Sequence, residues 1–233
     1  MTSAIDLWRI PAARLAPEIA SLRALLTPAE RARADAFRFA PDQARYAVFR
    51  GALRQVLGRH LNMAPERVAL SVGPHGKPQL PGDALHFNLT HSGPGAVLAV
   101  ATDGPIGVDI EVARSARLAA RLAPRVLSDA ESAAYDALPP IARATAFLRA
   151  WTCKEAYVKA TGEGLSFPLP RITVALCGPA RLLQVEGRED EPARWALHDL
   201  TVGWDVAGAL AAPTGATLRW FDHQADMALG GAL

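Results

Sequence analysis

Two carboxylates separated by a single residue stand in the segment 106–112, which reads I-G-V-D-I-E-V. Side chains alternate between the two faces of a strand, so Gly107, Asp109 and Glu111 are expected on one face and the apolar residues on the other. Two like charges this close repel each other, and a hard divalent cation such as Mg²⁺, which takes oxygen ligands, would relieve that repulsion. The glycine leaves room for another group to approach closely. A solvated acidic face on an edge strand is the alternative that this short motif leaves open.

A third carboxylate is expected to face inward from a helix. The spacing predicts a helix over residues 141–161 that ends at Gly162. Its apolar stripe is expected to run through Ile141, Leu148, Trp151 and Val158. Glu155 falls on this stripe, where a carboxylate is costly unless it is paired or bound to a metal. Lys159 could form an intrahelical pair with it, but a metal shared with the two strand carboxylates explains an inward position better.

Two other segments carry groups that suit a phosphate. Lys77 lies between Gly76 and Pro78 in a turn-forming cluster at residues 73–78, and it is one of only three lysines in the chain. An ordinary exposed lysine in a loop is an equally simple interpretation. Residues 87–93 read F-N-L-T-H-S-G, which predicts a strand that ends in hydroxyls, a histidine and a glycine. Such an end offers small hydrogen-bond donors to a phosphate, although a plain polar turn has the same composition.

The composition limits the class of protein. A chain of 233 residues that is 50% hydrophobic and 21% charged suits a globular protein of two lobes or two small domains. A net charge of +2 is too small to indicate binding to nucleic acid or to a membrane. The sequence contains no apolar run that would span a bilayer, and its start does not read as a signal peptide. Cys153 and Cys177 do not suggest a disulfide framework, so a reduced, cytoplasmic setting is expected.

The first half of the chain is expected to mix strands and helices. A short strand over residues 1–10 precedes a helix near residues 17–26. Thr27 and Glu30 form a capping box that starts the next helix, which the proline at position 41 is expected to break. Further expected elements are a helix over residues 43–62 and strands over residues 68–72, 87–93 and 96–101.

Residues 102–105, T-D-G-P, predict a hairpin that leads from the strand at 96–101 into the acidic strand. Ser128 and Glu131 form a second capping box, so Glu131 is expected to serve its helix end rather than a metal. Other expected elements are a helix over residues 114–125, strands over residues 172–176, 194–200 and 204–211, and a last strand after Pro213 followed by a frayed tail. The sequence contains no internal repeat strong enough to prove a duplication.

Taken in order, four segments resemble those of the 4'-phosphopantetheinyl transferases, in particular the long, two-lobed type that activates peptide and polyketide synthases. The segments are G-K-P at 76–78, F-N-L-T-H-S-G at 87–93, G-V-D-I-E at 107–111 and W-T-C-K-E-A-Y-V-K-A-T-G at 151–162. The pair formed by G-V-D-I-E and W-x-x-K-E-x-x-x-K is specific, and the likeness covers residues 20–176.

This resemblance implies an α+β fold, a pseudo-dimer of two similar lobes with the active site in the cleft between them. The N-terminal lobe would span residues 1–103 and the C-terminal lobe residues 104–233. The resemblance implies coenzyme A as donor, Mg²⁺ as cofactor and a serine of an acyl or peptidyl carrier protein as acceptor, with 3',5'-ADP released. The enzyme is expected to be a monomer that binds its carrier transiently.

The resemblance also implies roles for single residues. Glu155 corresponds to the general base of the family, and Lys159 to its phosphate-neutralising lysine. Metal ligands are implied at Asp109, Glu111 and Glu155. Contacts with the coenzyme are implied at Arg45, Arg50, Lys77, Thr90, His91 and Lys159. In the first lobe the match is looser, since Glu30 and Tyr46 stand where some members have basic or smaller residues.

Two other functions are compatible with parts of this pattern. One is a different Mg²⁺-dependent enzyme that acts on a nucleotide pyrophosphate, which would turn over without a carrier protein. The other is a non-catalytic module that binds coenzyme A or a carrier and would tolerate the loss of one acid. The presence of all three acids argues against the non-catalytic module.

Overall fold

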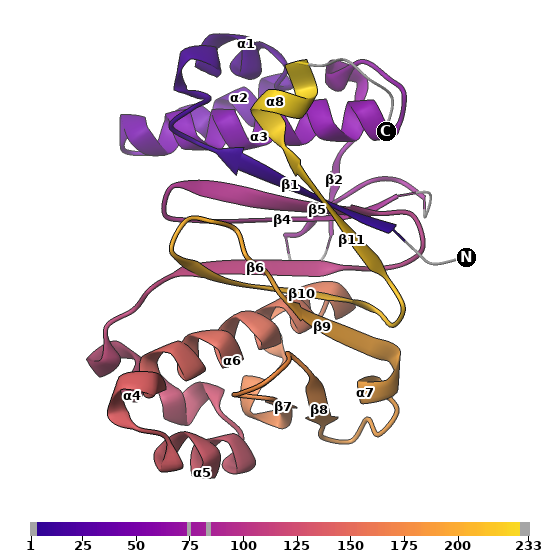
Figure 1. Ribbon diagram of the computed structural model, residues 1–233. Helices are drawn as coiled ribbons and strands as arrows, with labels where there is room; N and C mark the ends of the chain where they lie inside the picture. Colours follow the sequence, from indigo (N-terminus) through magenta and orange to yellow (C-terminus); the bar gives the residue numbers. More distant parts are fainter. Residues whose placement is uncertain (1–3, 74–75, 83–84, 229–233) are drawn as a thin grey trace.

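The computed structural model describes residues 4–73, 76–82 and 85–228. Two β-sheets lie one above the other between two groups of helices, so the layers run helices, sheet, sheet, helices (Figure 1). Each lobe contributes one sheet and the helices on its outer side. The expected α+β class with two lobes is therefore confirmed.

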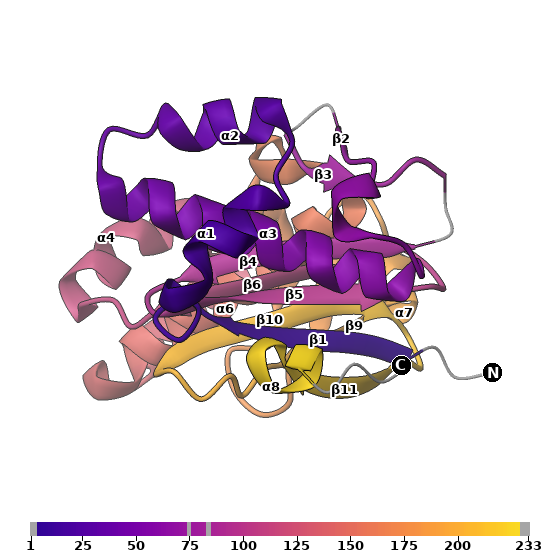
Figure 2. The ribbon, with the colours of Figure 1, turned by 90° about the horizontal axis from the view of Figure 1, so that it is seen from above.

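The first lobe carries its helices on the outer face of a four-stranded sheet of order β11-β1-β5-β4. Its strands are β1 (Ala4–Pro11), β4 (His86–Ser92), β5 (Gly95–Ala101) and β11 (Thr217–Asp222), with a separate small hairpin of β2 (Ser71–Val72) and β3 (Pro78–Gln79). Its helices are α1 (Ile19–Ala24), α2 (Pro28–Asp35), α3 (Ala40–His60) and α8 (His223–Ala228). The long helix α3 lies over the sheet, as the view from above shows (Figure 2).

The second lobe is built around a three-stranded sheet of order β6-β10-β9 and the long helix α6. The strands of this lobe, within and outside that sheet, are β6 (Gly107–Val112), β7 (Ile172–Val174), β8 (Leu182–Val185), β9 (Trp195–Asp199) and β10 (Val206–Pro213). Its helices are α4 (Ala116–Val126), α5 (Asp129–Ala137), α6 (Pro140–Thr161) and the short α7 (Glu191–Arg194). Single 3₁₀ turns occur at Ala16–Glu18, Pro65–Arg67, Gly164–Ser166 and Leu169–Arg171.

The two sheets meet through apolar side chains. Ile106, Val108 and Ile110, the expected apolar face of the acidic strand, belong to one buried cluster with Leu7 and Val97 of the first lobe. Burial of apolar side chains contributes about 1.5–3 kcal/mol for each large one, so this shared core holds the lobes together. The opposite face of β6, which carries the acids, is thereby turned toward the second lobe's helix α6.

Gly107 lies directly against the backbone of α6. A Cβ added at this position would come within 2.0 Å of the carbonyl oxygen of Ala156 and 2.4 Å of the amide nitrogen of Ala160. A separation of 2.0 Å is far below van der Waals contact, so only glycine permits this approach. On the other side, the amide of Val108 donates to Oδ1 of Asn88 at 2.8 Å and ties β6 to the first lobe.

The expected hairpin at residues 102–105 is wrong. β5 pairs with β1 and β4, whereas β6 pairs with β10, so the segment between β5 and β6 crosses from one sheet to the other. The tight turn lies one strand earlier, at Gly93 and Pro94, where Ser92 pairs with Gly95 and Gly93 has a φ of 58°. An Asp-Gly pair between apolar strands indicates a turn, but not which strands pair after it.

The end of the chain returns to the first lobe. β11 pairs in parallel with β1, and α8 packs against both of these strands. Residues 217–228 therefore extend the sheet of the first lobe, although the expected division placed everything after residue 103 in the second. The helix α8 forms where the sequence predicts a frayed tail after the last strand, and residues 1–3 and 229–233 lie outside the described part of the chain.

Local signals in the helices are mostly confirmed. The capping boxes at Thr27 and Ser128 are both present. The proline at position 41 begins α3 instead of ending α2, which fits the tolerance of a first helical turn for proline. The expected strand at residues 68–72 is limited to its last two residues. Ile141 is 91% exposed, so it does not belong to the buried stripe of α6.

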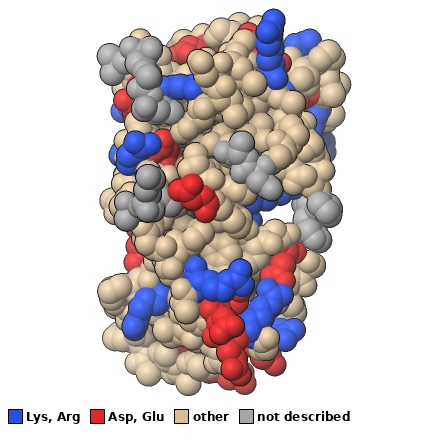
Figure 3. Space-filling view, turned by 90° about the vertical axis from the view of Figure 1, so that its right-hand side faces the viewer, with Lys and Arg blue, Asp and Glu red and all other residues tan. Residues whose placement is uncertain are grey.

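On the face drawn in Figure 3, basic and acidic residues lie beside one another and much of the surface is uncharged. Among the residues described there, no large area of this face carries charge of a single sign. This agrees with the small net charge of +2. Among the described residues, none of the helices combines the length and hydropathy that crossing a bilayer requires.

A buried ion pair ties α6 to the rest of its lobe. Lys154 is completely buried, and its ammonium donates to Glu131 and to the carbonyl oxygens of Val126 and Leu169. Glu131 also accepts from the amide of Val174 at 2.7 Å. The pair thus joins the end of α4, the start of α5 and the strand β7 to the helix that carries Glu155.

We expect Lys154→Met to lower the free energy of unfolding by about 3–5 kcal/mol, because it leaves a buried carboxylate without its cation. Urea unfolding followed by circular dichroism measures the change. The matched control is Arg23→Met, which breaks the exposed pair with Asp35 (side chains 34% and 59% exposed) and should cost less than about 1 kcal/mol. Equal effects of the two substitutions would contradict this description of the core.

Candidate active site

The acidic strand and α6 bring their charged side chains to one hollow at the junction of the lobes. This acid hollow has a volume of about 320 Å³, and among the residues that line it are Thr90, His91, Asp109, Glu111, Glu155 and Lys159. Asp109 is 4% exposed and Glu155 7% exposed. The sequence prediction that Glu155 faces inward, toward the two strand carboxylates, therefore agrees with its position.

Each acid of the strand has a defined set of partners. Nζ of Lys159 donates to Oδ1 of Asp109 at 2.5 Å, and Oγ1 of Thr90 lies 3.2 Å from the same oxygen. Glu111 is paired with Arg114 at 3.0 Å, and the hydroxyl of Ser92 lies 3.3 Å from its other oxygen. The alternative pair within α6, between Glu155 and Lys159, is thus not formed, and Lys159 pairs with β6 instead.

Two carboxylate oxygens in the acid hollow are buried without a hydrogen bond from any described residue, Oδ2 of Asp109 and Oε1 of Glu155. An unpartnered buried carboxylate oxygen is costly, and the protonation equilibria reflect this. Burial, and then the nearby Asp109, raises the pKa of Glu155 to about 7, with Lys159 acting in the opposite direction. Burial also raises the pKa of Asp109, although Lys159 opposes the change.

The oxygen-only donor set and the two unpartnered oxygens fit a hard divalent cation. Nζ of Lys159 donates to the other oxygen of Asp109, so the lysine and a cation would compete for that carboxylate. Across residues 4–73, 76–82 and 85–228, no three His, Cys, Asp or Glu side chains already form a closed ligand set. As they stand, these side chains do not enclose a cation, and the donor chemistry of the hollow is what fits one.

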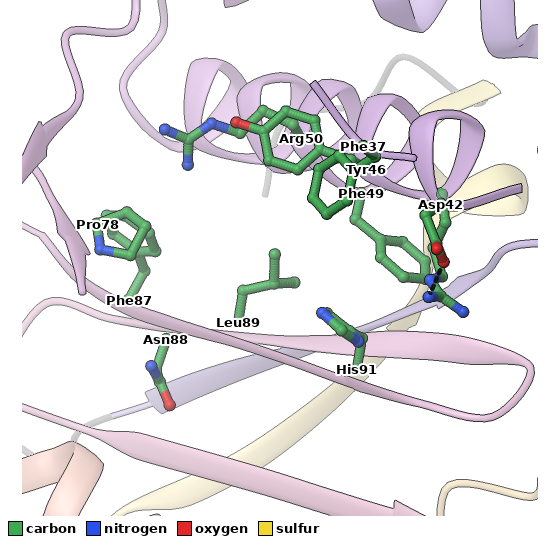
Figure 4. Close-up of a pocket in the computed structure, with 11 residues that line it drawn as sticks. Phe37, Asp42, Tyr46, Phe49, Arg50, Pro78, Phe87, Asn88, Leu89 and His91 are labelled. Carbon is green, nitrogen blue, oxygen red and sulfur yellow. Dashed lines mark hydrogen bonds and ion pairs between the residues drawn. The ribbon is translucent and has the colours of Figure 1, made fainter. Parts of the chain in front are cut away.

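A second hollow, the aromatic pocket, adjoins the first. It has a volume of about 410 Å³ and is lined by residues that include Phe37, Tyr46, Phe49, Leu89 and His91 (Figure 4). Leu89 and His91 line both hollows, so the two are neighbours. The ring of Phe49 stacks on His91 with centroids 5.5 Å apart, and Phe37 lies 5.6 Å from Tyr46. Flat rings at these positions suit a planar ligand.

Two arginines expected to contact the coenzyme line the aromatic pocket, and both have acidic partners. Arg45 is paired with Asp42, and Nε of Arg50 donates to Glu30 at 2.6 Å. Glu30 also accepts from Nε of the buried Arg54 at 2.8 Å. Its pKa is lowered despite its burial, because hydrogen bonds from the two arginines and from its capping box favour the charged form.

Lys77 is not among the residues that line either hollow. Its ammonium donates to the carbonyl oxygens of Ile106 and Lys159, while the next residue, Pro78, lines the aromatic pocket. Burial, and next the nearby charge of Lys159, lowers the pKa of Lys77 to about 8. Pro74 and His75 of the expected turn lie outside the described residues.

The structure thus assembles most of the residues singled out in the sequence, and it adds others. Thr90, His91 and the four charged residues of β6 and α6 meet in one hollow, and Arg45 and Arg50 reach the adjoining pocket. Sequence reasoning missed Phe37 and assigned Phe49 only to the helix core. Phe49 lies one turn after Arg45 on α3, which was the signal for it, whereas Phe37 lies in the bend between α2 and α3 and had none.

Both halves of the chain match known proteins in sequence. Residues 105–212 match the family model described as the 4'-phosphopantetheinyl transferase superfamily, and residues 14–103 match a model of the N-terminal part of a 4'-phosphopantetheinyl transferase. The 4'-phosphopantetheinyl transferase HetI of Nostoc sp. is 36% identical over 218 residues, which are 91% of this chain and 88% of that protein.

Two further relatives extend the comparison. A putative 4'-phosphopantetheinyl transferase of Synechocystis sp. is 34% identical over 72% of this chain and 68% of its own length. The 4'-phosphopantetheinyl transferase Sfp of Bacillus subtilis is 30% identical over 69% of this chain and 71% of its own length. With both lobes matched and the motif residues gathered in one hollow, this chain belongs to the 4'-phosphopantetheinyl transferase family.

Proposed function

We propose that the protein transfers the 4'-phosphopantetheine group of coenzyme A to a serine hydroxyl of an acyl or peptidyl carrier protein and releases 3',5'-ADP. The observation that carries this proposal is the convergence of Asp109, Glu111, Glu155 and Lys159 on one hollow beside an aromatic pocket. Attack of a hydroxyl on a pyrophosphate phosphorus needs charge neutralisation, positioning and a proton acceptor, and these side chains offer all three.

The nucleotide end of coenzyme A is assigned to the aromatic pocket. The rings of Phe37, Tyr46 and Phe49 offer stacking surfaces to adenine, and Arg45 and Arg50 lie on the same wall for the phosphates. His91 lines both hollows, so a coenzyme that fills the pocket would extend its pyrophosphate toward the acids. Burial, and next the nearby Arg45, lowers the pKa of His91, which would rise again beside a bound phosphate.

Asp109, Glu111 and Glu155 are assigned as the ligands of Mg²⁺, for which the two unpartnered oxygens of Asp109 and Glu155 are the support. The bound cation would neutralise charge on the pyrophosphate and on the departing nucleotide. Displacement of Lys159 from Asp109 would free its ammonium for a phosphate oxygen. The lysine would thus alternate between a carboxylate partner in the free enzyme and a phosphate partner in the complex.

Glu155 is assigned as the general base. Its pKa is about 7 in the metal-free protein, and a bound cation would lower it and keep the carboxylate ionised, as a proton acceptor must be. General base catalysis contributes roughly 10²–10⁴ in rate. In the transfer, the serine oxygen forms a bond to phosphorus, the bond from phosphorus to the nucleotide oxygen breaks, and the serine proton passes to Glu155 directly or through a water. We further propose that the enzyme acts as a cytoplasmic monomer.

The first experiment measures the mass of the carrier protein. Apo carrier protein incubated with the enzyme, coenzyme A and Mg²⁺ should gain the mass of one phosphopantetheine group, and Asp109→Ala should lower the rate at least about 100-fold because cation binding and the Lys159 contact are both lost. Glu186→Gln is the matched control, since Glu186 forms an exposed pair with Arg171 and should leave transfer unchanged.

Unchanged transfer by Asp109→Ala would refute the assignment. Turnover of coenzyme A by the wild-type enzyme without any carrier would favour instead the carrier-independent enzyme acting on a nucleotide pyrophosphate. Tight coenzyme binding without modification of any carrier would favour a binding module.

A second prediction concerns stability and pH. A rise of the Glu155 pKa from 4.5 to about 7 means that the folded protein holds a proton there that the unfolded chain releases. Stability therefore falls as pH rises from about 4.5 to 7, by roughly 3 kcal/mol for this group. Glu155→Gln should abolish transfer and yet raise the free energy of unfolding at pH 8 in EDTA by about 1–3 kcal/mol.

Urea unfolding of the two proteins at pH 8 and pH 5 measures this effect, and the gain should shrink at the lower pH as Glu155 regains its proton. The control is Glu186→Gln, for which no such gain is expected because this carboxylate is 66% exposed. A loss of stability at pH 8 in Glu155→Gln would contradict a strained, unpartnered carboxylate at this position.

A further inference from the structure

Lys77 stands at the small hairpin of the first lobe, directly before β3. The amide of Gly73 donates to the carbonyl of Lys77 at 2.9 Å, and Gly76 has a φ of 78°, which glycine adopts without strain. Val72 pairs with Pro78 across β2 and β3. The backbone of Lys77 is thus fixed between a turn and a strand pair, and its side chain extends from there toward the second lobe.

The ammonium of Lys77 contacts both elements of the acid hollow at the point where they meet. It donates to the carbonyl oxygen of Ile106 at 3.2 Å and to that of Lys159 at 2.7 Å. Ile106 precedes Gly107, whose missing Cβ lets β6 reach the backbone of α6. A single side chain of the first lobe therefore binds the start of β6 and the end of α6.

The contact with Lys159 also satisfies a helix end. The last four carbonyls of an α-helix lack partners within the helix, and Lys159 is among the last four residues of α6, which ends at Thr161. A cation at the C-terminal end of a helix is favoured by the helix dipole. The side chain of Lys159 is the one that pairs with Asp109, so Lys77 fixes the backbone from which that side chain extends.

We propose that Lys77 is a positioning residue, whose ammonium fixes α6 to β6 and so sets the separation of Lys159 from Asp109, and that it does not contact the coenzyme through its side chain. This rests on the proposed transfer reaction. The loop would still reach the coenzyme through Pro78, which lines the aromatic pocket. The two functions of the loop are thus divided between neighbouring residues.

The test separates kcat from KM for coenzyme A in Lys77→Met, with the Kd for coenzyme A measured by calorimetry in parallel. A displacement of about 1 Å in a reacting group can cost up to about 100-fold in rate, so kcat should fall about 10- to 100-fold. KM and Kd for coenzyme A should change less than about threefold. Lys77→Arg, whose guanidinium can donate to both carbonyls, should recover part of kcat.

Gln79→Met is the matched control, because Gln79 lines the same cavity of about 210 Å³ at the lobe junction as Lys77 but is expected to leave kcat unchanged. A rise of KM and Kd with kcat preserved would overturn the proposal in favour of a coenzyme contact. Unchanged kinetics in Lys77→Met would overturn it as well.

Thermal unfolding accompanies the kinetics to exclude loss of folded enzyme. If Lys77→Met does not fold, Lys77→Gln, which keeps a shorter, uncharged donor group, takes its place with the same expected split between kcat and KM. Transfer by the wild-type enzyme is measured first. If the wild-type enzyme does not transfer the group, the proposed reaction is refuted, whereas the role proposed for Lys77 is tested only by the variants.

Discussion

The close backbone contact between β6 and α6 at Gly107 is the constraint on which the candidate site depends. A Cβ at this position would lie 2.0 Å from the carbonyl oxygen of Ala156, so any other residue would force the strand and the helix apart. Because the strand runs at this short distance along the helix, Asp109 comes within 2.5 Å of Lys159, and Glu155, one turn earlier on α6, enters the same hollow. The shared core between the two sheets holds β6 in this place from its other side.

Burial of the acids in this arrangement costs the folded protein free energy. Oδ2 of Asp109 and Oε1 of Glu155 are buried without a hydrogen bond from any residue that the structure describes, and the pKa of both groups is raised, chiefly by burial. Elsewhere the same helix satisfies its buried charge, since Lys154 has three acceptors, one of them the carboxylate of Glu131. Among the described residues, the buried carboxylate oxygens that lack a hydrogen bond both lie in this hollow, as is typical of a site that binds a ligand there.

The sequence predicted the elements that act locally and misjudged those that depend on long-range pairing. Glu155 could be placed because a charged residue interrupted an apolar stripe, and both capping boxes formed because their partners are three residues apart. The return of β11 to β1 joins residues more than 200 positions apart, and no local pattern encodes it. The sequence predicted a coenzyme contact for Lys77, but it could not reveal the two backbone carbonyls of the other lobe to which the ammonium donates, because no residue type encodes such a contact.

The central claim is that three acids from a strand and a helix bind a single cation at the junction of the lobes. Anomalous diffraction from a crystal of the enzyme with Mn²⁺ and coenzyme A tests it most directly. We expect one peak about 2.1 Å from an oxygen of each of Asp109, Glu111 and Glu155, with Lys159 moved from Asp109 to a phosphate. A manganese ion bound elsewhere, or bound without Glu155 while Lys159 stays paired with Asp109, would contradict it.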